Sequence, residues 1–418
     1  MVERKRIYLC LAHMSDEGLE QKYIKEAFDT NWVVPLGPNV NGFEADLEAF
    51  CGQNKRVVAL SAGTAAVHLA LIACGVGPGD EVLVQSFTFC ASSHPITYLG
   101  ATPVFIDSEK DTWNMDPELL EKAIIDRKEK TGKYPKAIVP VALYGMPYRI
   151  DRIMEIADKY GIPVVEDAAE GFGSKFNGQV LGTFGKYGVL SFNGNKMITT
   201  SGGGALITEN EDEWREIMMY ATQYRESYPY YQHEKIGYNY RMSNICAGIG
   251  RGQMTVAAEH IAHHKHVQAL YEELLKDVKG VTVHSQPETG EYDSNYWLCT
   301  ITLDPELRVK DQENAYKTIV TGAVGGAAGV IHAASSAITD CQPNDNVEAL
   351  RVALDKAGIE ARPVWKPMHK QPCYKDAPAY VNGVSEAIFK VGMCLPAGPY
   401  VSDEDVKYIV DTIKANLI

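Results

Sequence analysis

Residues 57–76 read VVALSAGTAAVHLALIACGV, a short apolar run rich in β-branched residues followed by a longer helical pattern. The same alternation continues as far as residue 208, through EVLVQS (81–86), PVFID (103–107), PKAIVPVAL (135–143), IDRIMEIADKYG (150–161) and PVVEDAA (163–169). This rhythm is typical of βαβ crossovers. Residues 57–208 therefore predict an α/β fold with a doubly wound, mainly parallel sheet, whose ligands bind beyond the carboxyl ends of the strands.

At 418 residues the chain is longer than a single core usually supports, so we expect a second lobe. A long helical pattern at about 243–278 is followed by the strand-like segments VTVHS and YWLCTITLD. These patterns predict a large domain over residues 1–254 and a smaller C-terminal α/β domain over residues 255–418. Near the end of the chain, Ser402 with Asp405 three residues later predicts the start of a terminal helix.

The composition argues against several classes of protein. A net charge of −14 and a pI near 5.3 disfavour binding to nucleic acid or to an anionic membrane, because both need a basic surface. The nine cysteines are scattered and include no C-x-x-C pair, so neither a disulfide framework nor a metal site is predicted. The apolar run near the N-terminus is too short for a signal peptide, which predicts a cytoplasmic enzyme.

Residues 321–338, TGAVGGAAGVIHAASSAI, are apolar and rich in small residues. A membrane span needs about 20 predominantly apolar residues, whereas Gly, Ser, Thr and His fill much of this stretch. We expect either a buried Gly/Ala-rich helix or a mobile insertion in the smaller lobe.

Two polar segments directly follow predicted strands. The turn SAGT follows VVAL, and Gly63 and Thr64 there would offer backbone N–H groups and a hydroxyl to a phosphate at the start of a helix. Taken alone, a capped helix start explains this turn equally well. Asp167 ends the strand VVED, where it would be a metal ligand, a helix cap or the partner of a cofactor's ring nitrogen.

Two further segments each contain a positively charged side chain that is a candidate for the site. Lys196 lies in the otherwise uncharged stretch SFNGNKMITTSGGG, 191–204. Burial there would favour the neutral amine that imine formation and general-base catalysis both require, although an exposed loop lysine is the alternative. In GYNYRMSN, 237–244, Asn239 and Arg241 are placed to bind phosphate or carboxylate, and a turn followed by a helix cap is the alternative.

Together these segments resemble the DegT/StrS-type sugar aminotransferases, which have the aspartate aminotransferase-like, fold type I architecture. The resemblance covers nearly the whole chain, from NWVVPLGPNVNGFE at 31–44 to RPVWKPMH at 362–369 and CLPAG at 394–398. The interval between Asp167 and Lys196 is also similar to the family's interval between its pyridine aspartate and its Schiff-base lysine.

The resemblance implies pyridoxal 5'-phosphate (PLP) as the cofactor. Lys196 would hold PLP as a Schiff base and carry the proton between the substrate carbon and C4′. Asp167 would face the pyridine nitrogen and keep the ring protonated, which makes the ring an electron sink. The other implied contacts are Phe89 stacked on the ring, Glu170 beside the phenolic oxygen, Gly63, Thr64 and Ser191 at the phosphate, and Asn239, supplied to the phosphate by a neighbouring subunit. An active site shared in this way implies a homodimer.

Three departures from the family pattern bear on specificity. Glu170 stands where many members have Gln, and a second carboxylate there would alter the ionisation of the phenolic oxygen unless Glu170 is itself protonated. Ala142 stands where the usual motif has His, and the glycine turn reads SGGG. Lys196 and Asp167 are both present, so we expect an active enzyme, and the departures leave room for a different substrate preference.

The same segments look most like the branch that aminates C4 of a UDP-linked 2-acetamido-4-keto-6-deoxy sugar, as in bacillosamine formation. L-Glutamate would be the amino donor in a ping-pong cycle through pyridoxamine phosphate. The candidate substrate contacts are Arg241, Trp365, Lys366 and His369, with Arg241 and Lys366 also candidates for the glutamate carboxylates. Core packing of Trp365, and a solvated surface position for Lys366 and His369, are the alternatives.

A sugar dehydratase and a non-catalytic regulator or scaffold are the two alternative functions. In a sugar dehydratase of the same family, histidine typically replaces the Schiff-base lysine, so the presence of Lys196 argues against it. A non-catalytic regulator or scaffold would be expected to lack Lys196 or Asp167, or to carry a basic DNA-binding module. The sequence has both residues and no such module.

Overall fold

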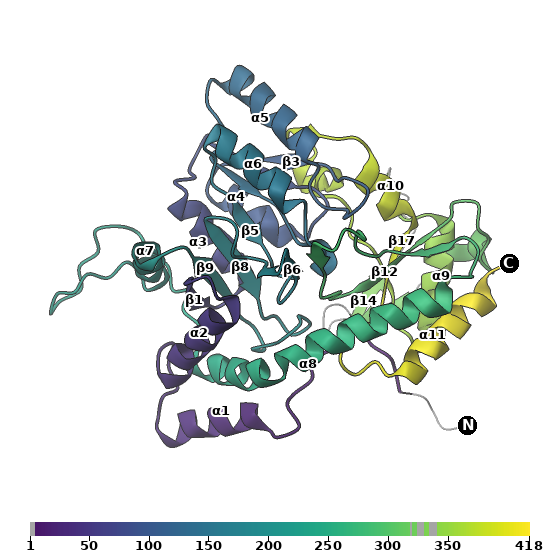
Figure 1. Ribbon diagram of the computed structural model, residues 1–418, viewed down its shortest axis with the longest axis horizontal. Helices are drawn as coiled ribbons and strands as arrows, with labels where there is room; N and C mark the ends of the chain where they lie inside the picture. Colours follow the sequence, from purple (N-terminus) through teal and green to yellow (C-terminus); the bar gives the residue numbers. More distant parts are fainter. Residues whose placement is uncertain (1–4, 318–319, 324–329, 334–340) are drawn as a thin grey trace.

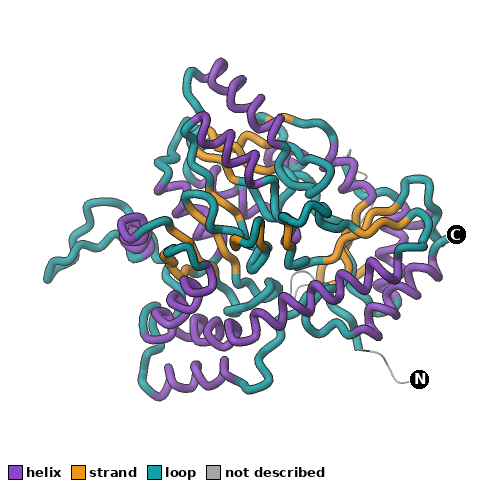
Figure 2. Tube along the Cα trace, in the orientation of Figure 1, coloured by secondary structure: helices purple, strands orange, loops and turns teal. Residues whose placement is uncertain are grey.

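The structure is a computed structural model that describes residues 5–317, 320–323, 330–333 and 341–418 (Figure 1). Most of the described strands belong to two groups, and the long helix α8 (Asn244–Leu275) runs along both of them (Figure 2). The first group forms the large sheet and the second belongs to the smaller C-terminal part. A separate three-stranded sheet consists of β11 (Tyr292–Asp293), β6 (Lys175–Phe176) and β7 (Gln179–Val180).

The large sheet is made of two four-stranded parts joined edge to edge. In order across the sheet, the strands are β16 (Ala379–Tyr380), β3 (Thr102–Ile106), β2 (Glu81–Gln85), β4 (Ala137–Val139), β5 (Val165–Asp167), β8 (Tyr187–Ser191), β9 (Gly204–Thr208) and β1 (Arg56–Leu60). Parallel bridges from Ile138 to Val164 and from Val141 to Asp167 connect the two parts. Only the pairings of β9 with β8 and with β1 are antiparallel among these described strands, so the predicted mainly parallel sheet is confirmed.

Alternation along the strands feeds a core on each face of this sheet. Val57 and Ala59 of β1 belong to one buried cluster, whereas Val58 and Leu60 belong to another. Successive side chains of a strand point to opposite faces, so an apolar run such as VVAL requires both faces to be covered. The helices of this part are α1 (Leu19–Asp29), α2 (Pro38–Cys51), α3 (Gly63–Ala73), α4 (His94–Tyr98), α5 (Pro117–Thr131), α6 (Ile150–Tyr160) and α7 (Glu211–Ala221).

The smaller part has its own antiparallel sheet and its own core. The strands, in order, are β10 (Val281–Val283), β12 (Cys299–Leu303), β17 (Gly392–Leu395) and β15 (Arg362–Pro363), and the helices are α9 (Asp345–Lys356), α10 (Val384–Val391) and α11 (Asp403–Asn416). Helix α11 begins with the predicted capping box, in which Ser402 and Asp405 bond each other's backbone N–H groups. The expected domain boundary after residue 254 falls inside α8, and the division itself stays a prediction.

The Gly/Ala-rich stretch is described only in part. Residues Val320–Ala323 and Val330–Ala333 form the antiparallel strands β13 and β14, so the expected helix is wrong for the described portion. For 324–329 and 334–338 the same expectation lies outside the described residues. Among the helices that the structure does describe, none has the length and apolar character needed to cross a membrane.

A long loop, residues 222–240, follows α7 and projects away from the rest of the chain (Figure 1, left). Large side chains on it are exposed, Tyr231 at 80% and Ile236 at 85%. The loop returns to the body where Asn239 pairs with Thr222 in an antiparallel bridge. A segment that leaves apolar surface in solvent in this way indicates a partner surface.

Candidate active site

The predicted cofactor-binding residues Gly63, Asp167, Ser191 and Lys196 lie where strands of the large sheet end. Strand β5 shows how the sheet separates two adjacent carboxylates. The side chain of Glu166 points to one face of the sheet, where it accepts hydrogen bonds from the backbone N–H groups of Phe184 and Gly185, both at 2.6 Å. Asp167 points to the opposite face, because neighbouring residues of a strand alternate. Glu166 therefore stabilises the turn that contains Phe184 and Gly185, and of the two carboxylates only Asp167 is available to the site.

The carboxylate of Asp167 is buried and held in a fixed orientation. Its Oδ2 accepts a hydrogen bond from Ser92 Oγ at 2.6 Å, and its Oδ1 accepts one from the N–H of Ala169 at 3.2 Å. Ser92 Oγ is in turn 2.7 Å from the hydroxyl of Thr88. Burial raises the pKa of Asp167, while the bond from Ser92 and the charge of Lys196 oppose that rise.

Lys196 is enclosed between an anion and an aromatic ring. Its Nζ donates to Oε1 of Glu170 at 3.1 Å and lies 4.1 Å from the centroid of the Trp297 ring. The lysine side chain is 13% exposed and that of Glu170 is 3% exposed. Burial raises the pKa of Glu170, and the charge of Lys196 opposes this. The surface-loop alternative for Lys196 therefore does not hold.

Gly63 and Ser191 meet at the predicted phosphate cradle. A Cβ added to Gly63 would lie 3.1 Å from Cβ of Ser191, and one added to Gly204 would lie 2.4 Å from the backbone nitrogen of Gly63. Helix α3 begins at Gly63, and within the described chain no side chain caps this end. Its first N–H groups, with the hydroxyls of Thr64 and Ser191 nearby, suit a phosphate.

Aromatic side chains gather between the lysine and the smaller part of the chain. Phe89 is 54% exposed, and its ring centroid is 5.5 Å from that of Trp365. Trp365 also contacts the rings of Tyr144 at 5.2 Å and Trp297 at 6.4 Å. Trp365 therefore joins the side chains around Lys196. Phe87 is fully buried, as its place in the period-two pair predicts.

The segment that carries Trp365 is fixed to the loop after β2. Ser86 Oγ is 2.6 Å from Nδ1 of His369 and also accepts the backbone N–H of His369 at 3.2 Å. Burial lowers the pKa of His369, which favours the neutral ring. Lys366 lies on the same segment and is partly buried. A solvated surface position for His369 is therefore not what the structure shows.

Two predicted residues lie apart from Lys196. Nη1 of Arg241 donates to Oε1 of Glu44 at 2.5 Å and to the carbonyl of Ala59 at 3.0 Å, with both charged side chains about nine-tenths buried. Arg241 is thus engaged in an internal ion pair. Asn239 is exposed on the projecting loop 222–240.

Four residues of the site were missed by sequence reasoning. They are Ser92, Tyr144, Asn295 and Trp297. Nδ2 of Asn295 donates to the carbonyls of Glu170 at 2.8 Å and Phe172 at 2.9 Å, which fixes the turn after β5. The local signal for each is weak, because an aromatic or a serine in a loop is common. For Asn295, a polar residue just ahead of an apolar strand was the available sign.

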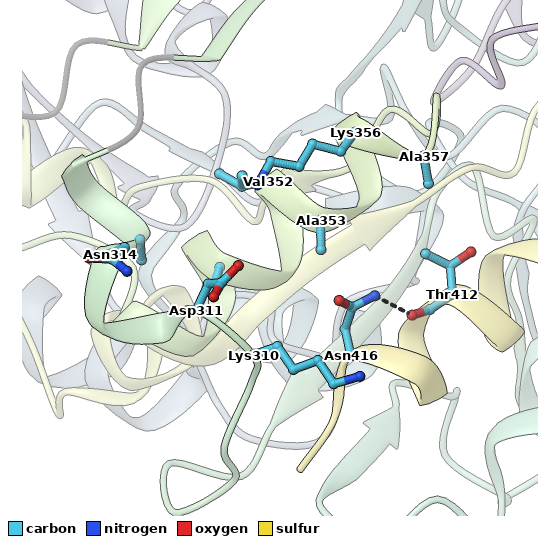
Figure 3. Close-up of a pocket in the computed structure, with 11 residues that line it drawn as sticks. Lys310, Asp311, Asn314, Val352, Ala353, Lys356, Ala357, Thr412 and Asn416 are labelled. Atoms are coloured by element: carbon cyan, nitrogen blue, oxygen red, sulfur yellow. Dashed lines mark hydrogen bonds between the residues drawn. The ribbon is translucent and has the colours of Figure 1, made fainter.

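A separate hollow of about 680 Å³ lies between the short helix η3 (Gln312–Lys317), α9 and α11 (Figure 3). Its wall includes Lys310, Lys356 and Asn416, whose Nδ2 donates to the carbonyl of Thr412. The predicted site residues are not part of its lining. The chemistry therefore belongs to the strand ends, where carboxylates and an amine converge, and we assign no role to this hollow.

The group at the strand ends fits PLP. Asp167 is a buried carboxylate suited to a pyridinium nitrogen, and the glycine-walled cradle at Gly63 suits a phosphate. Lys196 supplies the amine that PLP chemistry requires, and Phe89 is an exposed aromatic side chain. Each demand of the cofactor has a matching group in this chain.

Comparison with known proteins agrees with this arrangement. The model of the DegT/DnrJ/EryC1/StrS aminotransferase family matches residues 15–323 and 312–414. A Bacillus subtilis protein named "Putative pyridoxal phosphate-dependent aminotransferase EpsN" is 42% identical over 413 residues, 98% of this chain and 95% of that protein. GDP-perosamine synthase of Escherichia coli O157:H7 is 33% identical over 409 residues, 97% of this chain and 98% of that protein.

Solved structures give the same result for the fold. The crystal structure of a DegT DnrJ EryC1 StrS aminotransferase from Brucella abortus superposes with a TM-score of 0.81 at 28% identity, over 96% of this chain and 95% of that one. This confirms the predicted fold type I architecture. The chain therefore belongs to the DegT/DnrJ/EryC1/StrS aminotransferase family and is a PLP-dependent sugar aminotransferase.

Proposed function

We propose that this enzyme transfers the amino group of L-glutamate to the C4 ketone of a nucleotide-linked 4-keto-6-deoxy sugar, with a UDP-linked 2-acetamido sugar as the preferred acceptor. The observation that carries the proposal is the amine of Lys196, held 3.1 Å from Glu170 at the same sheet edge as the buried Asp167. The resemblance of SFNGNK and RPVWKPMH to the C4-aminating branch supports the acceptor. The relative named GDP-perosamine synthase makes a GDP-linked sugar the main competitor.

Bound PLP would supply an electron sink that makes a Cα proton of the substrate removable near neutral pH. The carboxylate of Asp167, oriented by Ser92 and by the N–H of Ala169, would keep the ring nitrogen protonated. The first turn of α3, with Thr64 and Ser191, would hold the phosphate. These groups fix both ends of the cofactor before any proton moves.

Lys196 would then carry the proton. Its free amine would serve as the base, and Glu170 and Trp297 hold it in place when it is protonated. In the first half-reaction glutamate and one water molecule would yield 2-oxoglutarate, and the amino group of glutamate would be retained in the site. In the second, the sugar ketone would receive that amino group and release its oxygen as water, so water balances over the cycle. Trp365 would form the wall beside the sugar, next to Phe89, which would stack on the cofactor ring.

We also propose a homodimer in which Asn239 of the partner subunit completes the phosphate site. Support comes from the projecting loop 222–240, which carries Asn239 together with exposed Tyr231 and Ile236 (Figure 1). A loop of this kind would bury its aromatic surface against a second copy of the chain. Each site would then be built from Lys196 of one subunit and Asn239 of the other.

Subunit mixing tests this sharing. Lys196→Ala and Asn239→Asp homodimers should each be nearly inactive, the second because a carboxylate replaces an amide at a phosphate. Unfolded together and refolded, an equal mixture should recover about a quarter of wild-type activity, since half of the dimers are mixed and each mixed dimer has one intact site. A mixture that stays as inactive as its components would contradict the shared site.

The acceptor is tested with a panel of nucleotide sugars. Enzyme loaded with PLP and L-glutamate should aminate a UDP-linked 2-acetamido-4-keto-6-deoxy sugar with a kcat/KM at least about tenfold above the dTDP- and GDP-linked 4-keto-6-deoxy sugars. Products would be identified by mass spectrometry, and C4 amination by NMR. A preference for the GDP sugar would overturn the nucleotide assignment. Amination of none of them would overturn the proposed function.

A further inference from the structure

Tyr144 makes two polar contacts that link the catalytic amine to the substrate wall. Its backbone N–H donates to Oε2 of Glu170 at 2.7 Å, while Nζ of Lys196 occupies Oε1 of the same carboxylate. Its phenol oxygen accepts the backbone N–H of Trp365 at 2.9 Å. One residue therefore touches the partner of Lys196 through its backbone and the Trp365 segment through its side chain.

The backbone of Tyr144 adopts a conformation that a non-glycine residue rarely takes. Its φ is 54° and its ψ is 19°, within the short turn Leu143–Gly145 after β4. A bulky residue in this left-handed region costs on the order of 1–3 kcal/mol, and such strain clusters at functional sites. In this conformation the backbone N–H of Tyr144 points into the site, toward the carboxylate of Glu170.

The side chain is equally constrained. Tyr144 is 4% exposed, and its ring lies against Trp365 at 5.2 Å and Trp297 at 6.5 Å. Burial raises the pKa of the phenol well above its ordinary value, so it stays protonated and can both accept from Trp365 and donate. These contacts therefore explain the position of the phenol without a role in proton transfer.

We propose that Tyr144 is a positioning residue that sets the distance between the Trp365 wall and the Lys196–Glu170 pair, and so tunes the sugar half-reaction selectively. This rests on the proposed function, in which Trp365 borders the sugar. The proposed function assigns Trp365 a contact with the sugar and none with glutamate. The two half-reactions should therefore respond differently when the phenol oxygen is removed.

Tyr144→Phe is the test variant, because it retains the ring, the turn and the N–H bond to Glu170 and removes the phenol oxygen that accepts from Trp365 and also bonds the thiol of Cys394. We expect KM for the best sugar of the panel to rise roughly three- to tenfold, as loss of one hydrogen bond predicts. The rate of the glutamate half-reaction, followed by cofactor absorbance, should stay within about twofold. Equal slowing of both half-reactions would overturn the proposal.

A second measurement does not depend on the sugar. The chain has five tryptophans, so fluorine NMR of protein labelled with 5-fluorotryptophan resolves few signals, and Trp365→Phe assigns one. Tyr144→Phe should shift or broaden the Trp365 signal and leave that of Trp214 unchanged. An unchanged Trp365 signal would overturn the proposal even if the enzyme aminates the panel sugars.

Tyr271→Phe is the matched control. Its hydroxyl is fully buried and donates to the carbonyl of Pro396 at 2.9 Å, in the core of the smaller part. Tyr271→Phe should leave the KM for the sugar and the Trp365 signal as in the wild type, even if it lowers the melting temperature. If the wild type aminates no panel sugar, the proposed function fails, and the fluorine signals still decide the role of Tyr144.

Discussion

Lys196→Ala is expected to lose at least about 1,000-fold of the rate of the glutamate half-reaction, because under the proposed function one side chain would be both the attachment point of PLP and the proton carrier. The structure places its amine 3.1 Å from Glu170 and 4.1 Å from the Trp297 centroid, and alanine would remove both contacts together with the amine. Stopped-flow absorbance of the reconstituted variant with L-glutamate measures the loss.

Lys186→Ala is the control for this experiment. Lys186 is also ion-paired, with its Nζ 3.1 Å from Oε1 of Glu213, but it lies on the surface of the large part. It should react with glutamate at the wild-type rate. If Lys196→Ala retained a tenth or more of wild-type turnover, the assignment of the catalytic lysine would be wrong.

Asp167→Asn is expected to reduce the rate of both half-reactions on the order of 100- to 1,000-fold, because it removes the fixed negative charge that we propose faces the ring nitrogen. The substitution preserves shape, and Ser92 can donate to the amide oxygen or accept from the amide nitrogen. PLP content and melting temperature should stay near wild type. Ser92→Ala, which keeps the charge and removes one bond, should cost on the order of tenfold.

A cofactor analogue separates charge from packing in this prediction. PLP methylated on its ring nitrogen carries a permanent positive charge and needs no carboxylate to keep it. Loading Asp167→Asn with this analogue should restore part of the lost rate, whereas a purely structural effect of the substitution would not be rescued. Wild-type activity of Asp167→Asn with ordinary PLP would contradict the role of this carboxylate.

The positions of Asp167 and Lys196 at strand ends could be predicted from the sequence, because each ends or follows an apolar run that is typical of a strand. Asp167 ends the apolar strand β5, and Lys196 follows β8 in an uncharged loop. Parallel strands align their carboxyl ends, so residues far apart in sequence meet at one edge. The glycine turn at Gly63 could be predicted for the same reason.

The other site residues depend on contacts that local patterns do not encode. Ser92 reaches Asp167 across 75 positions, and Trp297 lies in the smaller part of the chain. Arg241 has the sequence setting of an anion-binding residue, yet its partner is Glu44, 197 positions away. Tertiary pairing of this kind decides whether a charged residue serves the substrate or the fold, and it appears only once the chain is folded.

The central claim is that PLP is bound covalently to Lys196. Reducing the purified holoenzyme with sodium borohydride converts a carbon–nitrogen double bond to a stable single bond, and digestion with peptide mass spectrometry then locates the cofactor. We predict that the peptide containing Lys196 carries the phosphopyridoxyl group, and that prior addition of L-glutamate prevents this labelling. Labelling of a different lysine, or of none in protein that contains PLP, would contradict the account.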